Sequence, residues 1–220
     1  MIRSITVILL LLTSATLTAQ TVRFETNMGD FDVELYTSQA PITVSNFLTY
    51  VEDGDYSDSI VHRSIPNFVI QGGGFSVSNP SISNSIVTPI PTDPPIQNEF
   101  GASNVRGTIA MAKLGGDPDS ATNQWFVNLS DNSTILDSQN GGFTVFGEVT
   151  GTGMETVDAI AGLAVVNLDG GILGETPIMP SSLGDQYVVV NNIRLVPEPG
   201  SNLLLAFGLV GFLRMRRCAR

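Results

Sequence analysis

The chain has 220 residues and a formal net charge of −11, with 10 lysines and arginines against 21 aspartates and glutamates. Residues 20–196 are more acidic still, with five basic residues against twenty acidic ones, a net charge of −15. This charge argues against nucleic acid or an anionic membrane surface as a partner of that region. The only cysteine is Cys218 and the only histidine is His62, so the region has no disulfide and its composition gives no support for a metal or other cofactor.

The first 19 residues are typical of a secretory signal peptide. A short basic start is followed by an apolar core at residues 5–12, too short to span a membrane, and by a small, polar run that ends at Ala19. Cleavage is expected near Ala19, or after Ala15 because Leu17 suits the cleavage site poorly. The alternative is an uncleaved N-terminal anchor.

Residues 197–220 form a tail of three parts. Pro197 and Pro199 flank Glu198 and disfavour a helix there. The apolar run 203–213 is shorter than the ~20 residues that a stable membrane span needs, and the arginines after it favour the cytoplasmic side. This order of parts resembles the PEP-CTERM sorting signal. The resemblance implies an exosortase-type processing enzyme as a partner, transient membrane association, and export to the periplasm, envelope or surface of a Gram-negative bacterium. An ordinary C-terminal membrane anchor is the alternative.

Between these ends, residues 20–196 are long enough for one domain with its own core. Residues 21–36 alternate apolar and polar side chains around a turn at 27–30, which predicts a β-hairpin. A helix is expected to begin at Pro41 and to end at Gly54, because apolar residues recur there at helical spacing.

The rest of the domain is expected to be mainly strands. Four further strands are expected within 107–114, 124–129, 141–150 and 186–196, with a short helix at 154–163. The polar, proline-containing segment 76–97 is expected to be a surface loop with too little apolar content to join the core, and 167–184 is rich in glycine, proline and serine. Many strands with two short helices indicate a mainly β fold, a closed or nearly closed β-barrel capped by helices.

The segment 61–75, VHRSIPNFVIQGGGF, is the clearest candidate for a binding site. Its apolar residues suit the wall of a sheet, whereas Arg63 and Gln71 are costly to bury unless they have partners. Polar groups set into an apolar wall are typical of a binding pocket. Without further context, Arg63 reads as an ordinary surface cation paired with a carboxylate, and Gln71 as a group that satisfies the backbone beside the three glycines.

Four segments in order and register, 61–75, 107–116, 121–129 and 143–149, resemble the cyclophilin-type peptidyl-prolyl cis–trans isomerases. The similarity extends from about residue 22 to residue 195. It implies a closed eight-stranded antiparallel β-barrel with a short helix at each end and a substrate groove on the outer face. It also implies a monomer without a cofactor that acts on proline-containing polypeptides, here exported ones, and assists their folding.

The resemblance also implies roles for individual residues. Arg63 matches the catalytic arginine, and Phe68 and Gln71 accompany it as the first pocket aromatic and as the glutamine that contacts the substrate backbone. The expected substrate-binding residues are Val69, Ala112, Gln124, Phe126, Leu136 and Phe143. Among these, Phe126 and Leu136 match the floor and the far wall of the proline pocket.

Three positions depart from the family pattern. Val69 stands where many members have methionine, which implies a slightly wider pocket. Ile135 stands where some members have the tryptophan that is important for binding cyclosporin, and Phe143 where they have histidine. Both differences argue against strong sensitivity to that drug, and neither removes the arginine or the pocket.

The implied chemistry suits these residue types. Rotation about an X–Pro amide breaks no bond and needs no nucleophile or metal, only stabilisation of a twisted amide whose nitrogen gains a lone pair. Arginine stays protonated and presents several donors from a planar fork. Two other functions stay open: a surface or matrix protein that only binds proline-containing peptides, and a general holdase for unfolded chains.

Overall fold

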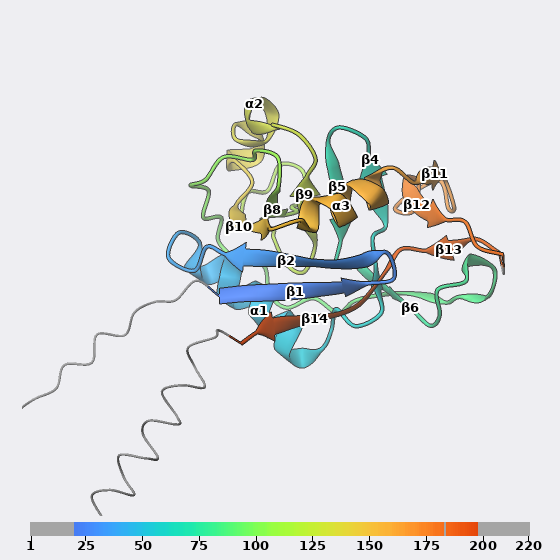
Figure 1. Cartoon of the computed structure of the whole chain (residues 1–220). Helices are drawn as coiled ribbons and strands as arrows, with labels where there is room; N and C mark the ends of the chain where they lie inside the picture. The colour runs from blue at the N-terminus through green and yellow to red at the C-terminus, as the bar shows by residue number, and fades with distance from the viewer. Residues whose placement is uncertain (1–19, 183, 198–220) are drawn as a thin grey trace, which may run out of the picture.

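The computed structural model describes residues 20–182 and 184–197 (Figure 1). The expected signal peptide and nearly all of the expected C-terminal tail therefore lie outside the described residues. The described part consists mainly of antiparallel β-strands with a few short helices, which confirms the expected fold class. No helix within it is long and apolar enough to cross a membrane.

One curled sheet contains eleven of the strands, and every neighbouring pair in it is antiparallel. In their order across the sheet, the strands are β4 (Arg63–Ile65), β5 (Val69–Gly72), β9 (Trp125–Asn128), β8 (Thr108–Met111), β10 (Val145–Thr150), β2 (Gly29–Leu35), β1 (Gln20–Thr26), β14 (Val189–Val196), β3 (Ser59–Ile60), β6 (Phe75–Val77) and β7 (Val87–Pro89). The predicted hairpin is β1 and β2, and the four further predicted strands are β8, β9, β10 and β14.

The expected closure into eight strands is not confirmed. The sheet is open, with β4 and β7 as its two edges. β3 and β4 are separated only by Val61 and His62, whose backbone N–H groups donate to Val188 O at 3.0 Å and Gln71 O at 3.1 Å, respectively. The chain thus crosses between two distant parts of the sheet in one irregular step. A kinked connection, rather than a ladder of paired strands, links the edge strand β4 to β3.

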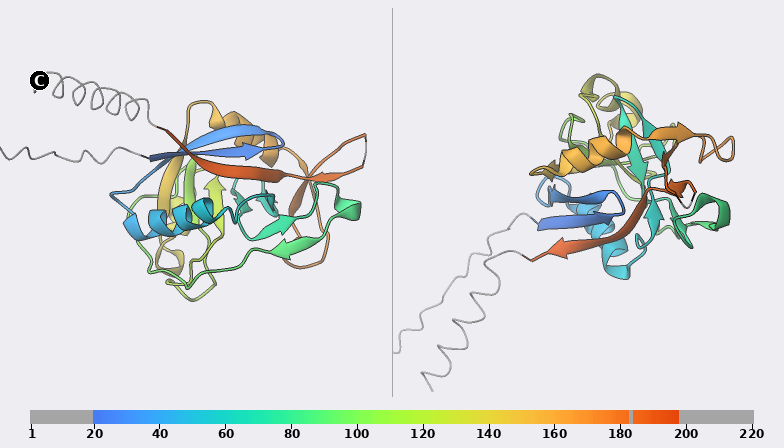
Figure 2. Two further views of the ribbon diagram at one scale, coloured as in Figure 1. Left: turned by 90° about the horizontal axis from the view of Figure 1, so that it is seen from below. Right: turned by 45° about the vertical axis from the view of Figure 1, so that its right-hand side comes forward.

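Two helices cover the sheet, as predicted. α1 (Pro41–Asp53) buries Val44, Phe47 and Tyr50 and ends at Gly54, which has a φ of 76° that suits glycine. α3 (Gly153–Ala161) lies against β2, β5 and β10, whereas α1 lies against β14. The two helices are on opposite sides of the β1–β2 hairpin (Figure 2). The remaining helical segments are single turns: α2 (Ser133–Leu136), η1 (Ile82–Asn84) and η2 (Gln139–Gly141).

A smaller antiparallel sheet lies beside β4, with the order β11 (Ala164–Val166), β12 (Thr176–Met179) and β13 (Gln186–Tyr187). β12 falls within the segment 167–184, for which the sequence indicated only a glycine-, proline- and serine-rich stretch. Its Thr176 and Ile178 are buried, at 0 % and 4 % exposure. Burial by neighbouring elements gives this stretch a regular structure that its composition does not predict.

The segment 76–97 also differs from the expectation of a surface loop. It contributes most of β6 and all of β7, which pair as a hairpin. Val77 is buried beside β3, and Ile90 is 4 % exposed in the main core. Ile82, Val87 and Ile96 are partly buried against the same clusters, so a few apolar residues anchor the segment although its average composition is polar.

Aromatic side chains fill the inside of the curled sheet. Phe24 stacks on Phe31 with ring centroids 4.6 Å apart and meets the edge of Trp125 at 5.1 Å. Phe47 of α1 reaches Phe146 of β10 at 5.0 Å. Trp125 is fully buried, so the wall formed by β5 and β9 is supported from inside by the largest side chain of the core.

Gly147, on β10, tests how tightly the curled sheet is packed. A Cβ at this position would lie 2.6 Å from Glu34 O on the paired strand and 3.0 Å from Val33 Cγ1. Gly147→Ala should therefore lower the free energy of unfolding by about 1–3 kcal/mol, as overpacking does in other cores. Gly115→Ala is the matched control, because no atom lies within 4 Å of the added Cβ. Urea denaturation of both variants measures the difference, and equal stability would contradict the packing described here.

Candidate active site

Alternation along β5 and β9 divides the wall of the sheet into two faces. Ile70 and Trp125 point into the core and are fully buried. Val69, Gln71 and Phe126 point to the other side, because successive side chains on a strand project in opposite directions. Val69 and Phe126 belong to a second apolar cluster, separate from the main core. The strand pattern therefore builds an apolar surface on the outer face of the sheet.

Strand register aligns the candidate residues in one row. Arg63 on β4 pairs with Gln71 on β5, Gln71 pairs with Phe126 on β9, and Phe126 pairs with Ala110 on β8. Four neighbouring strands thus carry the cation, the amide and the aromatic ring side by side. The distances along the row are fixed by the backbone hydrogen bonds of the sheet.

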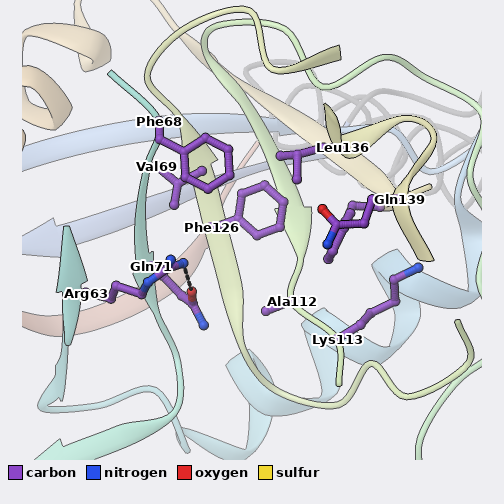
Figure 3. Close-up of a pocket in the computed structure, with 10 residues that line it drawn as sticks. Arg63, Phe68, Val69, Gln71, Ala112, Lys113, Phe126, Leu136 and Gln139 are labelled. Atoms are coloured by element: carbon purple, nitrogen blue, oxygen red, sulfur yellow. Dashed lines mark hydrogen bonds between the residues drawn. The ribbon is translucent and has the colours of Figure 1, made fainter. Parts of the chain in front are cut away.

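The row leads into a hollow of about 210 Å³. Its lining residues are Arg63, Phe68, Val69, Gln71, Ala112, Lys113, Phe126, Leu136, Gln139 and Phe143. Phe68, Phe126 and Leu136 converge on its apolar part, whereas Arg63 and Gln71 lie together at one side (Figure 3). The hollow is smaller than the ~300–1,000 Å³ of pockets that enclose drug-sized ligands. Its size suits one small apolar group held beside a polar rim.

A buried amide network holds the apolar walls in place. Asn132 donates to Phe68 O at 2.8 Å and to Asn128 Oδ1 at 2.8 Å, and Asn104 donates to Phe143 O at 3.0 Å. Asn128 links the other two through a 3.3 Å hydrogen bond to Asn104 Oδ1. These three asparagines are at most 5 % exposed, so their bonds are protected from water. Nothing in the sequence singles them out, because asparagine more often marks turns.

The polar side of the hollow is a chain of side-chain hydrogen bonds. Arg63 Nη1 donates to Gln71 Oε1 at 3.2 Å, which is the dashed line in Figure 3. Gln71 Nε2 in turn donates to Gln124 Oε1 at 2.9 Å. Arg63 Nε donates to Glu175 Oε2 at 2.9 Å, and the arginine side chain keeps 34 % of its surface exposed. The guanidinium group is therefore held from two sides and still reaches solvent.

The structure brings all nine predicted site residues together. Eight of them line the hollow, and Gln124 is joined to them through its hydrogen bond with Gln71. Gln124 also lines the two neighbouring cavities. Lys113, Gln139 and Glu175 were not predicted. The first two have no distinctive pattern around them, and Glu175 lies 112 residues from the arginine that it contacts.

Lys113 organises the loop that carries Phe143. Its Nζ donates to Gly142 O at 2.6 Å and Asn140 O at 2.9 Å, and it lies 4.9 Å from the centre of the Phe143 ring. Partial burial lowers the pKa of the lysine. Phe143 meets Phe126 edge to face at 5.8 Å. The Lys113 ammonium group thus helps to fix the Phe143 ring, one aromatic wall of the hollow.

His62, beside Arg63, is neutral in the folded protein. Burial lowers its pKa from 6.5 to about 4, and the positive charge of Arg63 acts in the same direction. It is 2 % exposed and meets Phe75 edge to face at 5.2 Å. This environment suits a packed side chain. Among residues 20–182 and 184–197, no three histidine, cysteine, aspartate or glutamate side chains gather as they would to hold a metal ion.

Two family models match the chain. The model described as "Cyclophilin type peptidyl-prolyl cis-trans isomerase/CLD" matches residues 21–179. The model of the PEP-CTERM protein-sorting motif matches residues 195–217. The first match covers more than half of the chain, and the second covers most of the tail.

Curated relatives and solved structures agree with the first match. A peptidyl-prolyl cis-trans isomerase of Acinetobacter baylyi is 41% identical over 166 residues, which cover 73% of this chain and 83% of the relative. Peptidyl-prolyl cis-trans isomerase B of Escherichia coli is 43% identical over 149 residues, 65% of this chain and 85% of the relative. The crystal structure of a cyclophilin type isomerase from Cryptosporidium parvum aligns with a TM-score of 0.62 at 26% identity, covering 83% of this chain and all of that one.

The low pKa of His62 predicts a pH-dependent loss of stability. The unfolded chain keeps a histidine pKa near 6.5, so it binds a proton at higher pH than the folded protein does. Stability from this group is complete above pH 6.5 and is lost as the pH falls toward 4. The loss should reach about 1.4 kcal/mol per pH unit. Urea denaturation between about pH 6.5 and 5, where carboxylates contribute least, measures it. His62→Gln should have a flatter profile in this range, and identical slopes would contradict the assignment.

Proposed function

The chain belongs to the cyclophilin-type peptidyl-prolyl cis–trans isomerases, and we propose that it isomerises X–Pro bonds of exported polypeptides, with Arg63 stabilising the twisted amide. One observation carries this proposal: a hydrogen-bonded arginine and glutamine stand at the rim of a small apolar hollow on the outer face of the sheet. The reaction needs a hydrogen-bond donor directed at the proline nitrogen and, beside it, an apolar space that holds the proline ring.

The reaction sets a clear physical requirement. Rotation about the amide has a barrier of about 18–20 kcal/mol and takes tens to hundreds of seconds without a catalyst. At the top of the barrier, resonance is lost and the proline nitrogen has a lone pair that either planar isomer lacks. A donor that meets this lone pair lowers the barrier because it binds the twisted state more strongly than the ground states.

The apolar hollow supplies the other half of the mechanism. Phe126 is its floor, Phe68 and Leu136 are its walls, and Phe126 and Leu136 are at most 5 % exposed. A proline ring in this space would stay fixed while the preceding carbonyl group swings through solvent. The ring would also displace water that competes for the Arg63 donors. Gln71, Ala112 and Gln124 would contact the backbone of the substrate along the rim.

Export is the proposed setting of this activity. The match of residues 195–217 to the PEP-CTERM motif supports export to the cell envelope and processing by an exosortase-type enzyme. We divide the chain into a signal peptide (1–19), an isomerase domain (20–196) and a sorting tail (197–220). The domain acts as a monomer, and its contact with the membrane is transient and made through the tail.

A second candidate function is binding without turnover. The sorting motif favours it, because a protein placed at the cell surface can serve as a matrix component that holds proline-containing peptides. The same hollow and rim would serve both functions. Only the second requires that binding survive the loss of Arg63 while no isomerisation is measured.

Replacing Arg63 separates these functions. Arg63→Ala should lower kcat/KM for a proline peptide by about 10²–10³-fold, the usual effect of losing one donor aimed at the transition state. Arg63→Lys should recover little, since a lysine is a looser point charge without the planar fork. A protease-coupled or NMR exchange assay measures the rates. Arg194→Ala is the control, because Arg194 makes a comparable ion pair with Glu25 at 2.6 Å, away from the hollow.

The outcomes of this assay are distinct. Equal turnover in the wild type and Arg63→Ala would overturn the catalytic assignment. Peptide binding by Arg63→Ala, together with no turnover in the wild type, would favour the matrix-binding function. Binding of proline-free unfolded chains would point to a holdase instead.

The tail gives an independent prediction. Mass spectrometry of the protein recovered from the cell envelope should find a C-terminus shortly after Pro197-Glu198-Pro199, because the sorting motif directs removal of the apolar and basic residues beyond these prolines. Glu198→Ala should accumulate the longer, unprocessed form. An intact C-terminus through Arg220 in the wild type would count against processing.

A further inference from the structure

Glu175 lies against the side of Arg63 that faces away from Gln71. Its Oε2 accepts the Nε hydrogen at 2.9 Å, while Nη1 donates to Gln71 at 3.2 Å. These two bonds come from opposite ends of the guanidinium group and fix both its position and its plane. Nη2 makes no hydrogen bond to any residue in the described ranges 20–182 and 184–197. One donor group of the fork is thus left for a ligand.

The backbone places Glu175 opposite the arginine independently of the ion pair. Ser64 N donates to Glu175 O at 2.8 Å, and Arg63 and Glu175 form a parallel β-bridge. The adjoining Thr176 donates from its hydroxyl to His62 O at 3.0 Å and is fully buried. The backbone bridge and the threonine hydrogen bond therefore attach this point of the chain to the edge of β4.

The loop before Glu175 is held by its own hydrogen bonds. Asp169 Oδ1 accepts from the backbone of Gly171 at 2.7 Å and of Leu173 at 3.0 Å, and Asn167 Oδ1 accepts from Gly170 at 2.6 Å. A backbone hydrogen bond also runs from Leu168 N to Leu173 O at 3.0 Å. The loop forms one wall of a second cavity, on the far side of Arg63 from the hollow. These hydrogen bonds hold the loop in one conformation, and the loop in turn holds the Glu175 carboxylate beside Arg63.

We propose that Glu175 is a positioning residue that aims Arg63 at the proline nitrogen. This inference rests on the proposed function and assigns a new role within the same site. A free arginine side chain samples many rotamers, and each bond that selects one of them reduces the entropy lost when the donor meets the twisted amide. Glu175 makes this selection before the substrate binds.

Because the Arg63–Glu175 pair is exposed, we expect it to orient the arginine more than it stabilises the fold. The side chains of Arg63 and Glu175 are 34 % and 50 % exposed, so the attraction between them is screened by water. The carboxylate also reduces the net positive charge at the rim. The group that the arginine has to meet is the lone pair of a neutral nitrogen, for which the direction of a donor matters more than the total charge around it.

Two substitutions in the full chain test the proposal. Glu175→Ala removes the acceptor and should lower kcat by about tenfold with KM within about twofold, because misaimed donors slow the chemical step more than they weaken binding. Glu175→Gln keeps an acceptor oxygen and removes the charge, so it should retain at least about half of the wild-type kcat. Thermal unfolding of both variants reports whether the fold is kept.

A double-mutant cycle identifies the partner through which Glu175 acts. In an Arg63→Ala background, Glu175→Ala should change kcat by less than about twofold, because no donor remains to be aimed. Glu25→Ala is the matched control: it removes the glutamate from an Arg–Glu pair of the same type, Arg194 and Glu25, at 2.6 Å on the β1–β14 ladder. It should leave kcat unchanged.

Each result distinguishes the inference from the function on which it rests. A loss of about 10²–10³-fold in Arg63→Ala with no loss in Glu175→Ala would overturn the positioning role and leave the isomerase proposal in place. A folded Glu175→Gln as slow as Glu175→Ala would show that the acceptor is not what matters, which also overturns it. An effect of Glu175→Ala that persists without Arg63 would do the same. No loss in Arg63→Ala would instead reject the proposed mechanism.

Discussion

The site depends on the strict alternation of side chains along two paired strands. On β5 and β9, every second residue enters the aromatic core and the residues between them form the floor and rim of the hollow. A shift of register by one residue would exchange the two sets, placing Gln71 among aromatic rings and Trp125 in solvent. The same pairing that stabilises the sheet therefore also specifies the site. Fold and function are not separable at these positions.

Polar contacts around β5 and β9 fix the parts of the site that the strands do not supply. The asparagine network holds the backbone at Phe68 and Phe143, Lys113 holds the loop 139–143, and the loop 167–174 carries Glu175. Each contact joins segments that are distant in the sequence. With only Cys218 in the whole chain, no disulfide can take over this task. Packing and hydrogen bonds alone keep the site in shape.

The sequence predicts the local parts of this arrangement well and the long-range parts poorly. The β1–β2 hairpin, both longer helices and β9, the strand that carries Phe126, follow from periodicity and turn residues. The order of the motifs predicts which residues meet at the hollow, and the structure does bring those residues together. Ile90 and Thr176 lie in stretches of polar or flexible composition, and their burial depends on partners elsewhere in the chain. Glu175 was missed for the same reason, since nothing near it in the sequence points to Arg63.

Two of the three glycines after Gln71 bring the backbone close to the core. Added Cβ atoms at Gly72 and Gly73 would lie 2.6 Å and 2.8 Å from ring atoms of Trp125, so the indole lies directly against the backbone there. Trp125 is the only tryptophan in the chain. Its fluorescence therefore reports on a single place, the inner side of the wall whose outer side is the candidate active site. Trp125 is thus an intrinsic fluorescent probe of the candidate active site. It is adjacent to Phe126 on β9 but faces the core, so a ligand in the hollow would not touch it.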